Sequence, residues 1–252
     1  MITLQEFCQY LEELLEVATI TDQYCPNGLQ VEGAASIEGI ATSVTASLVA
    51  IEKAVKAGVQ VLLVHHGMFW RHDSFEIIGV KRQKLRILLE NNLSLVAYHL
   101  PLDVHQHYGN NWKAARDLGW DNLEPFAANN GFFLGVKGTF SPASRDTFRA
   151  SLEEYYQHPA AVALGGKEQV SSAALVSGGA YRYLLEAASE NVDCFVTGNF
   201  DEPAWHMAHE EKINFFALGH AATEKVGIRA IGTHLQQHFG VKNIFIDDVN
   251  PF

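Results

Sequence analysis

Cysteine is scarce in this chain of 252 residues, and its pattern excludes the common roles of clustered thiols. The three cysteines are Cys8, Cys25 and Cys194. No two of them form a Cys-x-x-Cys pair, and an odd number cannot pair completely within one chain. This usage argues against a disulfide framework and favours reduced thiols in a cytoplasmic protein.

Positive charge is also in short supply. The chain has 18 Lys and Arg residues against 29 Asp and Glu residues, which gives a formal net charge of −11. Because affinity for nucleic acid comes mainly from Lys and Arg contacts to phosphate, this balance argues against a nucleic-acid partner.

Long hydrophobic runs are missing. The longest apolar stretches have the length of strands, so we expect no membrane-spanning segment and no membrane partner. Residues 3–17 form an acidic, amphipathic segment, which is typical of a surface helix and unlike a signal peptide. The 48% hydrophobic content is enough to bury a large core as one large domain or two small ones.

What the chain has is an alternation of strand-like and helix-like segments. Strands are predicted at 40–45, 59–64, 93–97, 173–176, 192–196, 214–218 and 244–246. Helices are predicted at 47–57, 81–90, 110–118, 181–189, 203–211 and 220–239. This order predicts an α/β fold of two similar halves, residues 1–125 and 126–252, each with a largely parallel or mixed sheet. The linker is expected around residues 125–131.

Histidines and carboxylates follow three of these strands. They are His65 and His66 after 59–64, His99 and Asp103 after 93–97, and His220 and Glu224 after 214–218. Such groups at the ends of buried strands are costly unless they share a partner, and a metal ion is the simplest one. Since α/β proteins place their sites at the carboxyl ends of strands, these strings predict a metal site there.

Spacing refines this hypothesis. His220 and Glu224 lie four residues apart at the start of a helix, so both face the same side. His99 and Asp103 have the same spacing, but Pro101 favours a turn over a helix. Taken singly, each string has a structural interpretation, such as a capping pair or a core histidine.

The number of ligands indicates two metal ions. Neighbouring residues on a strand point to opposite faces, so His65 and His66 reach two metals more easily than one. Even three of these histidines with the two carboxylates, and no cysteine, are too many for one catalytic zinc with an open position. They suit a dinuclear site with one bridging carboxylate.

Five strings in this order resemble the Nif-three-like family (NGG-interacting factor), whose members are often named GTP cyclohydrolase type 2 homologues. They are Asn-Gly-Leu-Gln-Val at 27–31, Val-His-His-Gly at 64–67, His-Leu-Pro-Leu-Asp at 99–103, Thr-Gly at 197–198 and Gly-His-x-Ala-Thr-Glu at 219–224. The resemblance spans nearly the whole chain and is to the short form without an insertion. One departure is Asn199, where many relatives have Glu; Asp201 and Glu202 are the nearest carboxylates.

The resemblance implies two related α/β halves facing each other across a dinuclear metal site, and a ring-shaped homohexamer. The implied ligands are His66 and Asp103 for one metal ion, His65 and His220 for the other, and Glu224 as the bridge. His99 would lie close by, either as a group that supports the ligands or as a catalytic group that moves a proton. Imidazole and carboxylate ligands suit Zn, Fe, Mn, Co or Ni.

Hydrolysis is the reaction class that such a site favours, because two bridged metals acidify a shared water and polarise the bond that it attacks. The resemblance implies a small-molecule, nucleotide substrate and opening of the imidazole ring of GTP. A phosphoester or an amide would suit the same site. The alternatives are a metal-binding interaction or regulatory protein without turnover and, least favoured, a nucleic-acid binder that uses the interior of the ring.

Overall fold

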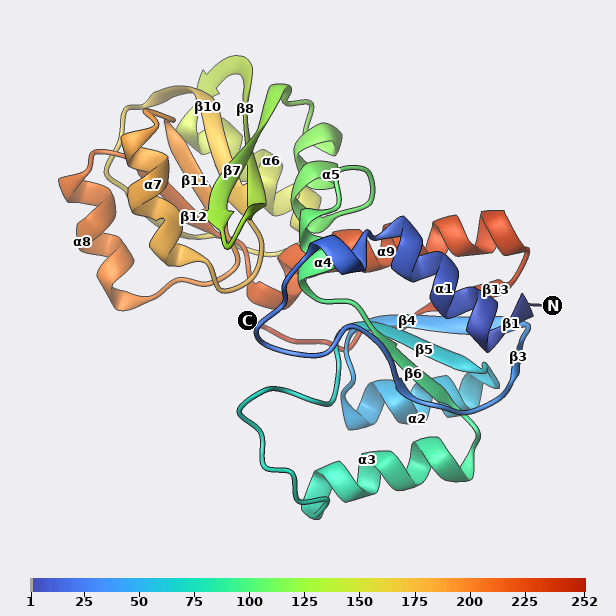
Figure 1. The fold of residues 1–252 in the computed structure, drawn as a ribbon. Coiled ribbons are helices and arrows are strands. Elements are labelled where there is room, and N and C mark those ends of the chain that lie inside the picture. The colour runs from blue at the N-terminus through green and yellow to red at the C-terminus, as the bar shows by residue number, and fades with distance from the viewer. Residues whose placement is uncertain (1) are drawn as a thin grey trace. The chain divides into compact units, whose positions relative to one another are not determined.

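The structure is a computed structural model that describes residues 2–252 and divides into two compact units. Unit 1 consists of Met1–His105 and Gly227–Val249, and unit 2 of Gln106–Val226 and Asn250–Phe252. This division differs from the predicted halves 1–125 and 126–252. The reason is a long-range pairing, because the last strand of the chain joins the sheet that the N-terminal part begins (Figure 1).

Unit 1 is built on a five-stranded sheet with the strand order β13-β4-β5-β6-β2. Its strands are β13 (Lys242–Phe245), β4 (Gly39–Thr45), β5 (Val61–His66), β6 (Ser94–Ala97) and β2 (Gly28–Val31). The first four run parallel, as predicted, and β2 is antiparallel to β6. A further short pair joins β1 (Ile2–Thr3) to β3 (Ser36–Ile37).

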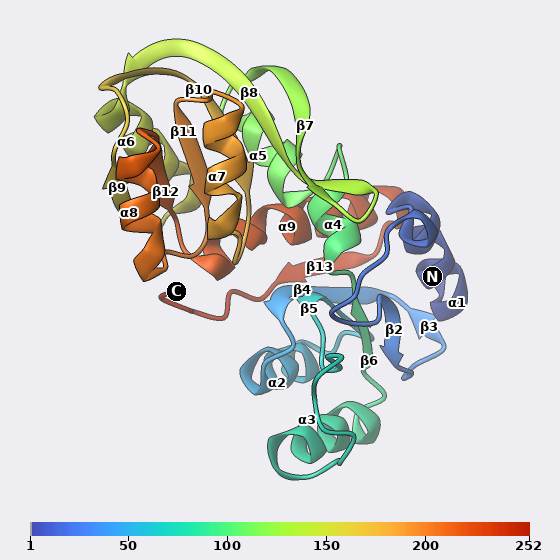
Figure 2. The same cartoon turned by 60° about the vertical axis from the view of Figure 1, so that its left-hand side comes forward.

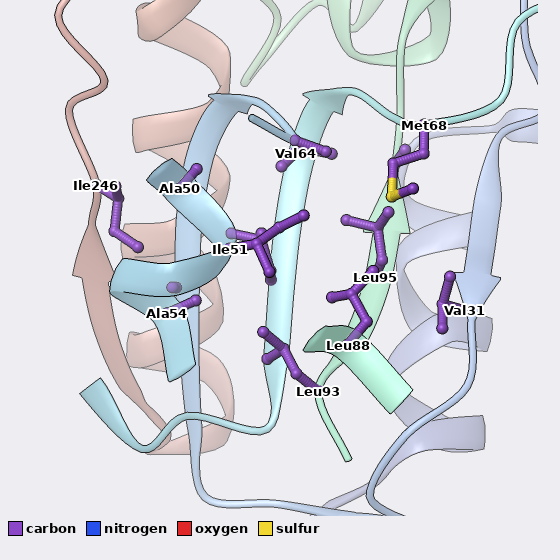
Figure 3. Close-up of a cluster of buried hydrophobic side chains, with 14 of the residues drawn as sticks. Val31, Ala50, Ile51, Ala54, Val64, Met68, Leu88, Leu93, Leu95 and Ile246 are labelled. Carbon is purple, nitrogen blue, oxygen red and sulfur yellow. The ribbon is translucent and has the colours of Figure 1, made fainter. Parts of the chain in front are cut away.

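Helices cover both faces of this sheet. Helices α2 (Leu48–Ala57) and α3 (Gly79–Glu90) lie on one face, and α1 (Leu4–Leu14) and the later part of α9 (His220–Phe239) lie on the other. Figure 3 shows the core under α2, where Ile51 of the helix packs beside Val64 and Leu95 of the strands. Full burial of each such side chain stabilises the fold by roughly 1.5–3 kcal/mol. Because all members of this cluster belong to unit 1, the unit has a core of its own.

The ends of α2 illustrate how local sequence sets these elements. The Ser47 hydroxyl accepts a hydrogen bond from the backbone N–H of Ala50 at 2.9 Å, which satisfies a donor of the first turn. Gly58 closes the helix with φ +68°, a left-handed conformation that costs glycine little. The predicted helix 47–57 is therefore confirmed.

Unit 2 is built on a six-stranded sheet with the order β7-β8-β10-β11-β12-β9. The central strands β10 (Gln169–Val176), β11 (Cys194–Thr197) and β12 (Asn214–Ala217) are parallel. The flanking strands β7 (Asp121–Asn129), β8 (Phe132–Ser144) and β9 (Ala161–Leu164) are antiparallel to their neighbours. Mixed sheets were an alternative that the sequence left open.

The linker predicted around residues 125–131 is wrong, because this segment forms the β7–β8 hairpin. Its two turn residues, Asn130 and Gly131, have φ +46° and +94°. Asn-Gly is the dipeptide that best tolerates two successive positive φ angles, which a tight hairpin turn requires. The Asn130-Gly131 dipeptide therefore marks a hairpin turn and not a linker between domains.

Helices cover both faces of the second sheet (Figure 2). Two hydrophobic clusters are buried in this unit. Helices α5 (Asn110–Asp117) and α6 (Arg145–Tyr156) supply Trp112 and Phe148 to one cluster. Helices α7 (Leu184–Ser189) and α8 (Glu202–Glu210) supply Leu184 and Ala204 to the other. Unit 2 thus also has an independent core.

Three shorter helices and one long one complete the fold. They are η1 (Val17–Thr19), α4 (Leu100–Val104), η2 (Tyr181–Tyr183) and α9 (His220–Phe239), which begins in unit 2 and ends in unit 1. Across residues 2–252, no helix combines the length and the apolar character needed to cross a membrane. Cys8, Cys25 and Cys194 are all buried with free thiols.

Candidate metal centre

In unit 1 the predicted ligands meet at the carboxyl end of two neighbouring strands. β5 ends with His65 and His66, and parallel β6 leads through Tyr98 into His99. The ring centroids lie 4.6 Å apart for His65 and His66, 5.0 Å for His65 and His99, and 5.7 Å for His66 and His99. The three imidazoles that the sequence singled out in this half therefore form one cluster.

His65 is held in one orientation by its backbone surroundings. Its side chain is 0% exposed, and its Nδ1 donates to the carbonyl oxygen of Tyr98 at 3.1 Å. Because a carbonyl can only accept, the proton of the neutral ring is on Nδ1 and the lone pair is on Nε2. Nε2 lies 3.6 Å from Asp103 Oδ2. His66 has a similar arrangement, with Nδ1 3.2 Å from the Thr45 hydroxyl.

Asp103 lies on a helix, so the turn predicted for residues 99–103 is wrong. Helix α4 places Pro101 in its first turn, where a backbone N–H has no helical partner and proline costs nothing. The backbone N–H of Asp103 donates to the His99 carbonyl at 3.2 Å. This turn carries the nearly buried carboxylate back to His65.

Asp22 is a member of the cluster that the sequence did not reveal. Its Oδ2 accepts from His99 Nδ1 at 2.9 Å, although the two residues are 77 positions apart and Asp22 lies in an irregular loop. Burial alone would raise the pKa of this carboxyl, but the hydrogen bonds and charge of His99, with further donors from Tyr24 and Asn27, hold it well below its usual range.

In unit 2 the ligand residues lie at the corresponding edge of the parallel strands. Helix α9 follows β12 and begins with His220. His220 Nε2 is 3.1 Å from Glu224 Oε1, so the predicted same-side placement is confirmed. The Glu224 residue is only 3% exposed, whereas the His220 side chain is about one-third exposed.

Two glycines shape the space around this pair, and sequence reasoning gave them no role. Gly178 has φ +67°, and a Cβ at this position would lie 2.3 Å from Glu224 Oε1. A Cβ on Gly198 would lie 2.8 Å from the Cα of His220. Any side chain at Gly178 would therefore push the carboxylate from its place. The Thr223 hydroxyl fixes the same loop by accepting from the Gly178 N–H at 3.0 Å.

Asn199 lies beside the His220–Glu224 pair. The nearest carboxylates along the chain, Asp201 and Glu202, make contacts elsewhere. A Cβ on Gly179 would have both the Asn199 amide nitrogen and the His220 ring within 3.6 Å. Asp201 caps helix α8, where its Oδ1 accepts from the backbone N–H of Glu202 at 2.9 Å. Glu202 is exposed on that helix, 3.8 Å from His206. The side chain beside the His220–Glu224 pair at this position is therefore a neutral amide.

The donor set of unit 1 fits a divalent cation. His65, His66 and His99 each offer a ligand atom within 4.8 Å of the others. A second group, Asp22, Cys25 and His99, meets the same distance criterion but does not fit. There the carboxylate already accepts several N–H donors, and burial with the Asp22 charge raises the pKa of the Cys25 thiol far above neutrality.

Comparison with known families decides where this chain belongs. Residues 2–251 match the family model Duf34/NIF3 (NGG1p interacting factor 3). The chain belongs to the NIF3 family. The resemblance inferred from the five strings is thereby confirmed.

Relatives of this NIF3-family chain are similar over their whole length. A protein of Chlamydia muridarum is 53% identical over 244 residues, with 96% of each chain covered, and one of Pseudomonas aeruginosa is 38% identical, with 99% of each covered. Both are named GTP cyclohydrolase 1 type 2 homolog.

Solved structures share the mixed α/β fold with two sheets. Protein ybgI, of unknown function, superposes with a TM-score of 0.94 at 36% identity and 100% coverage of both chains. Reduced HcgD from Methanocaldococcus jannaschii superposes with a TM-score of 0.86 at 25% identity and 98% coverage of both.

Proposed function

We propose that this NIF3-family chain is a hydrolase that depends on two divalent metal ions. The observation that carries the proposal is the cluster of three imidazoles at the ends of β5 and β6, with ligand atoms within 4.8 Å of one another. The ligand residues would be His65, His66, Asp103, His220 and Glu224, with the Glu224 carboxylate shared between the two ions. The donor set suits Zn, Fe, Mn, Co or Ni.

The protein's own groups prepare such a site for catalysis. When bound, the metal ions supply Lewis-acid chemistry that acidifies water and polarises the bond under attack. The Tyr98 carbonyl holds His65 in one tautomer, and the Thr45 hydroxyl contacts the ring of His66. His99 would move a proton between the attacking water and the leaving group.

The substrate proposed first is GTP, with hydrolytic opening of its imidazole ring. The support is the name shared by the curated relatives, GTP cyclohydrolase 1 type 2 homolog. Phosphoesters and amides are the competing substrate classes, because the same metal chemistry would cleave them.

Turnover of metal-replete protein tests this function. Wild type is expected to consume GTP in a chromatographic assay that also offers a phosphodiester and an amide. His99→Gln should keep its metal ions and lose about 100-fold or more in kcat, since positioned proton transfer contributes that much. If wild type with bound metal turns over none of these substrates, the hydrolase proposal fails and a metal-binding interaction or regulatory role replaces it.

Removing the metal ions is expected to leave the protein folded. Each unit buries its own hydrophobic clusters, so folding does not depend on metal as it does in a zinc finger. Chelator-treated protein should keep its circular dichroism spectrum and a cooperative thermal transition. The lost binding energy should lower stability by about 4 kcal/mol at most, the value for ligand at a thousand times its Kd. Loss of the cooperative transition would contradict this expectation.

A further inference from the structure

Asp22 lies outside the proposed ligand set, and its carboxylate is surrounded by hydrogen-bond donors. Its side chain is 2% exposed. Oδ1 accepts from the backbone N–H groups of Tyr24 at 2.8 Å and Cys25 at 3.3 Å. Oδ2 accepts from His99 Nδ1 at 2.9 Å, Asn27 Nδ2 at 3.2 Å and the Leu100 N–H at 3.3 Å. This many donors to one buried carboxylate fix its position tightly.

The same loop holds His99 from several sides. The backbone N–H of His99 donates to Asn27 Oδ1 at 2.7 Å. The rings of Tyr24 and Trp70 stand edge-on to the imidazole, with centroids 5.9 and 5.4 Å away. The ring is therefore constrained both by its backbone and by its neighbours, and the hydrogen bond at Nδ1 selects between its two neutral forms.

The chemistry of that hydrogen bond determines which nitrogen carries the proton. An ionised carboxylate can only accept, so the proton of neutral His99 must be on Nδ1. Nε2 then has the lone pair. One ring nitrogen of His99 lies within 4.8 Å of ring nitrogens of His65 and His66, and Nε2 is the one that does not contact Asp22.

We propose that Asp22 is a positioning residue that locks His99 in the Nδ1–H tautomer and so presents a bare Nε2 beside His65 and His66. The chemical use of that Nε2, as the acceptor of a proton during hydrolysis, rests on the proposed function. The tautomer itself does not depend on it.

Asp22→Asn is the variant that reverses this arrangement. An amide has one acceptor oxygen and one donor NH₂ group. The shortest backbone donor, Tyr24 N–H, faces Oδ1, so the amide oxygen is expected at that position. The NH₂ group then faces His99 Nδ1 and donates to it, which places the imidazole proton on Nε2. The side chain keeps its size and the two hydrogen bonds that Oδ1 accepts from the Tyr24 and Cys25 N–H groups.

Asn27→Ala is the matched control. It removes the acceptor for the His99 backbone N–H and one donor to Asp22, but it leaves the carboxylate facing Nδ1. A purely structural role for the loop would make both variants behave alike. The proposal predicts that only Asp22→Asn changes the tautomer.

Two-bond ¹H–¹⁵N correlation spectra of metal-free, histidine-labelled protein, recorded across a pH series, show directly whether each ring is neutral and which nitrogen carries the proton. His99 is assigned by its absence from the His99→Gln spectrum. We expect a protonated Nδ1 in wild type and Asn27→Ala, and a protonated Nε2 in Asp22→Asn. A protonated Nε2 in wild type overturns the proposal without any variant, and so does an unchanged tautomer in folded Asp22→Asn.

Kinetics separate this proposal from the proposed function. Metal-replete Asp22→Asn should keep the metal content of wild type and its KM, while kcat falls about 100-fold. If metal-replete wild type shows no turnover, the hydrolase proposal fails while the tautomer result still decides the role of Asp22. If the tautomer reverses and kcat is unchanged, the positioning role in catalysis is overturned.

Discussion

Replacing Glu224 by Gln is expected to weaken metal binding by about 100-fold or more. Loss of a residue that only hydrogen-bonds to a ligand already costs up to about 100-fold in affinity, and a ligand itself should cost at least as much. Glu224 is almost fully buried at the start of α9, and its Oε1 lies 3.1 Å from His220 Nε2. In the proposed site its carboxylate touches both metal ions. Gln has the same size, but it removes the negative charge and one of the two ligand oxygens.

The chain contains a matched control for this substitution. Glu202 and His206 repeat the same residue types at the same helical spacing, with the Glu202 carboxylate 3.8 Å from the imidazole and its side chain 81% exposed. Glu202→Gln should therefore leave metal affinity unchanged. Competition against a chromophoric chelator measures the affinity of both variants. Equal affinities for Glu224→Gln and wild type would remove Glu224 from the ligand set.

Gly178→Ala is expected to have the second large effect, a loss of metal binding together with about 1–2 kcal/mol of stability. The stability loss arises because residue 178 has φ +67°, a left-handed conformation that alanine adopts at a cost. The loss of metal binding arises because the new Cβ would lie 2.3 Å from Glu224 Oε1, so the carboxylate must move.

Gly179→Ala separates the local effect from a general one. Its Cβ would meet nothing closer than 3.5 Å, which is ordinary contact. It should bind metal like wild type. Metal titration and thermal unfolding of the chelator-treated proteins measure the two quantities. If both alanine variants bind metal equally well, the close fit of Gly178 around the carboxylate has no functional role.

The parallel strands and the positions of their terminal histidines could be predicted because both depend on local patterns. Continuous apolar runs mark β5 and β12, and the polar residues that end them stand out. The helix predicted from His220 to Phe239 has the observed bounds, since a glycine with positive φ follows it at Gly240.

The antiparallel strands and the division into units could not be predicted in this way. β7 contains Pro125 and few β-branched residues, so it lacks the usual strand pattern, and its pairing with β8 depends on the Asn130-Gly131 turn. The pairing of Lys242 with Gly39 joins opposite ends of the chain. Periodicity reports the local conformation of a segment and not its distant partner.

The candidate site shows the same limit. His65, His66, His99, Asp103, His220 and Glu224 could be selected because each follows a predicted strand. Asp22 could not, because its role depends on a loop that folds back onto His99 across 77 positions. Gly178 could not be selected either. It matters because a side chain there would collide with Glu224, which belongs to another element, and the sequence does not show this proximity.

The metal content of wild-type protein tests the central claim most directly. Elemental mass spectrometry on protein purified without chelator is expected to give about two divalent metal ions per chain, as the number of ligands requires. Protein that contains no metal as purified, and takes up none when Zn, Mn or Fe is added, would contradict the dinuclear site and the hydrolase proposed on it.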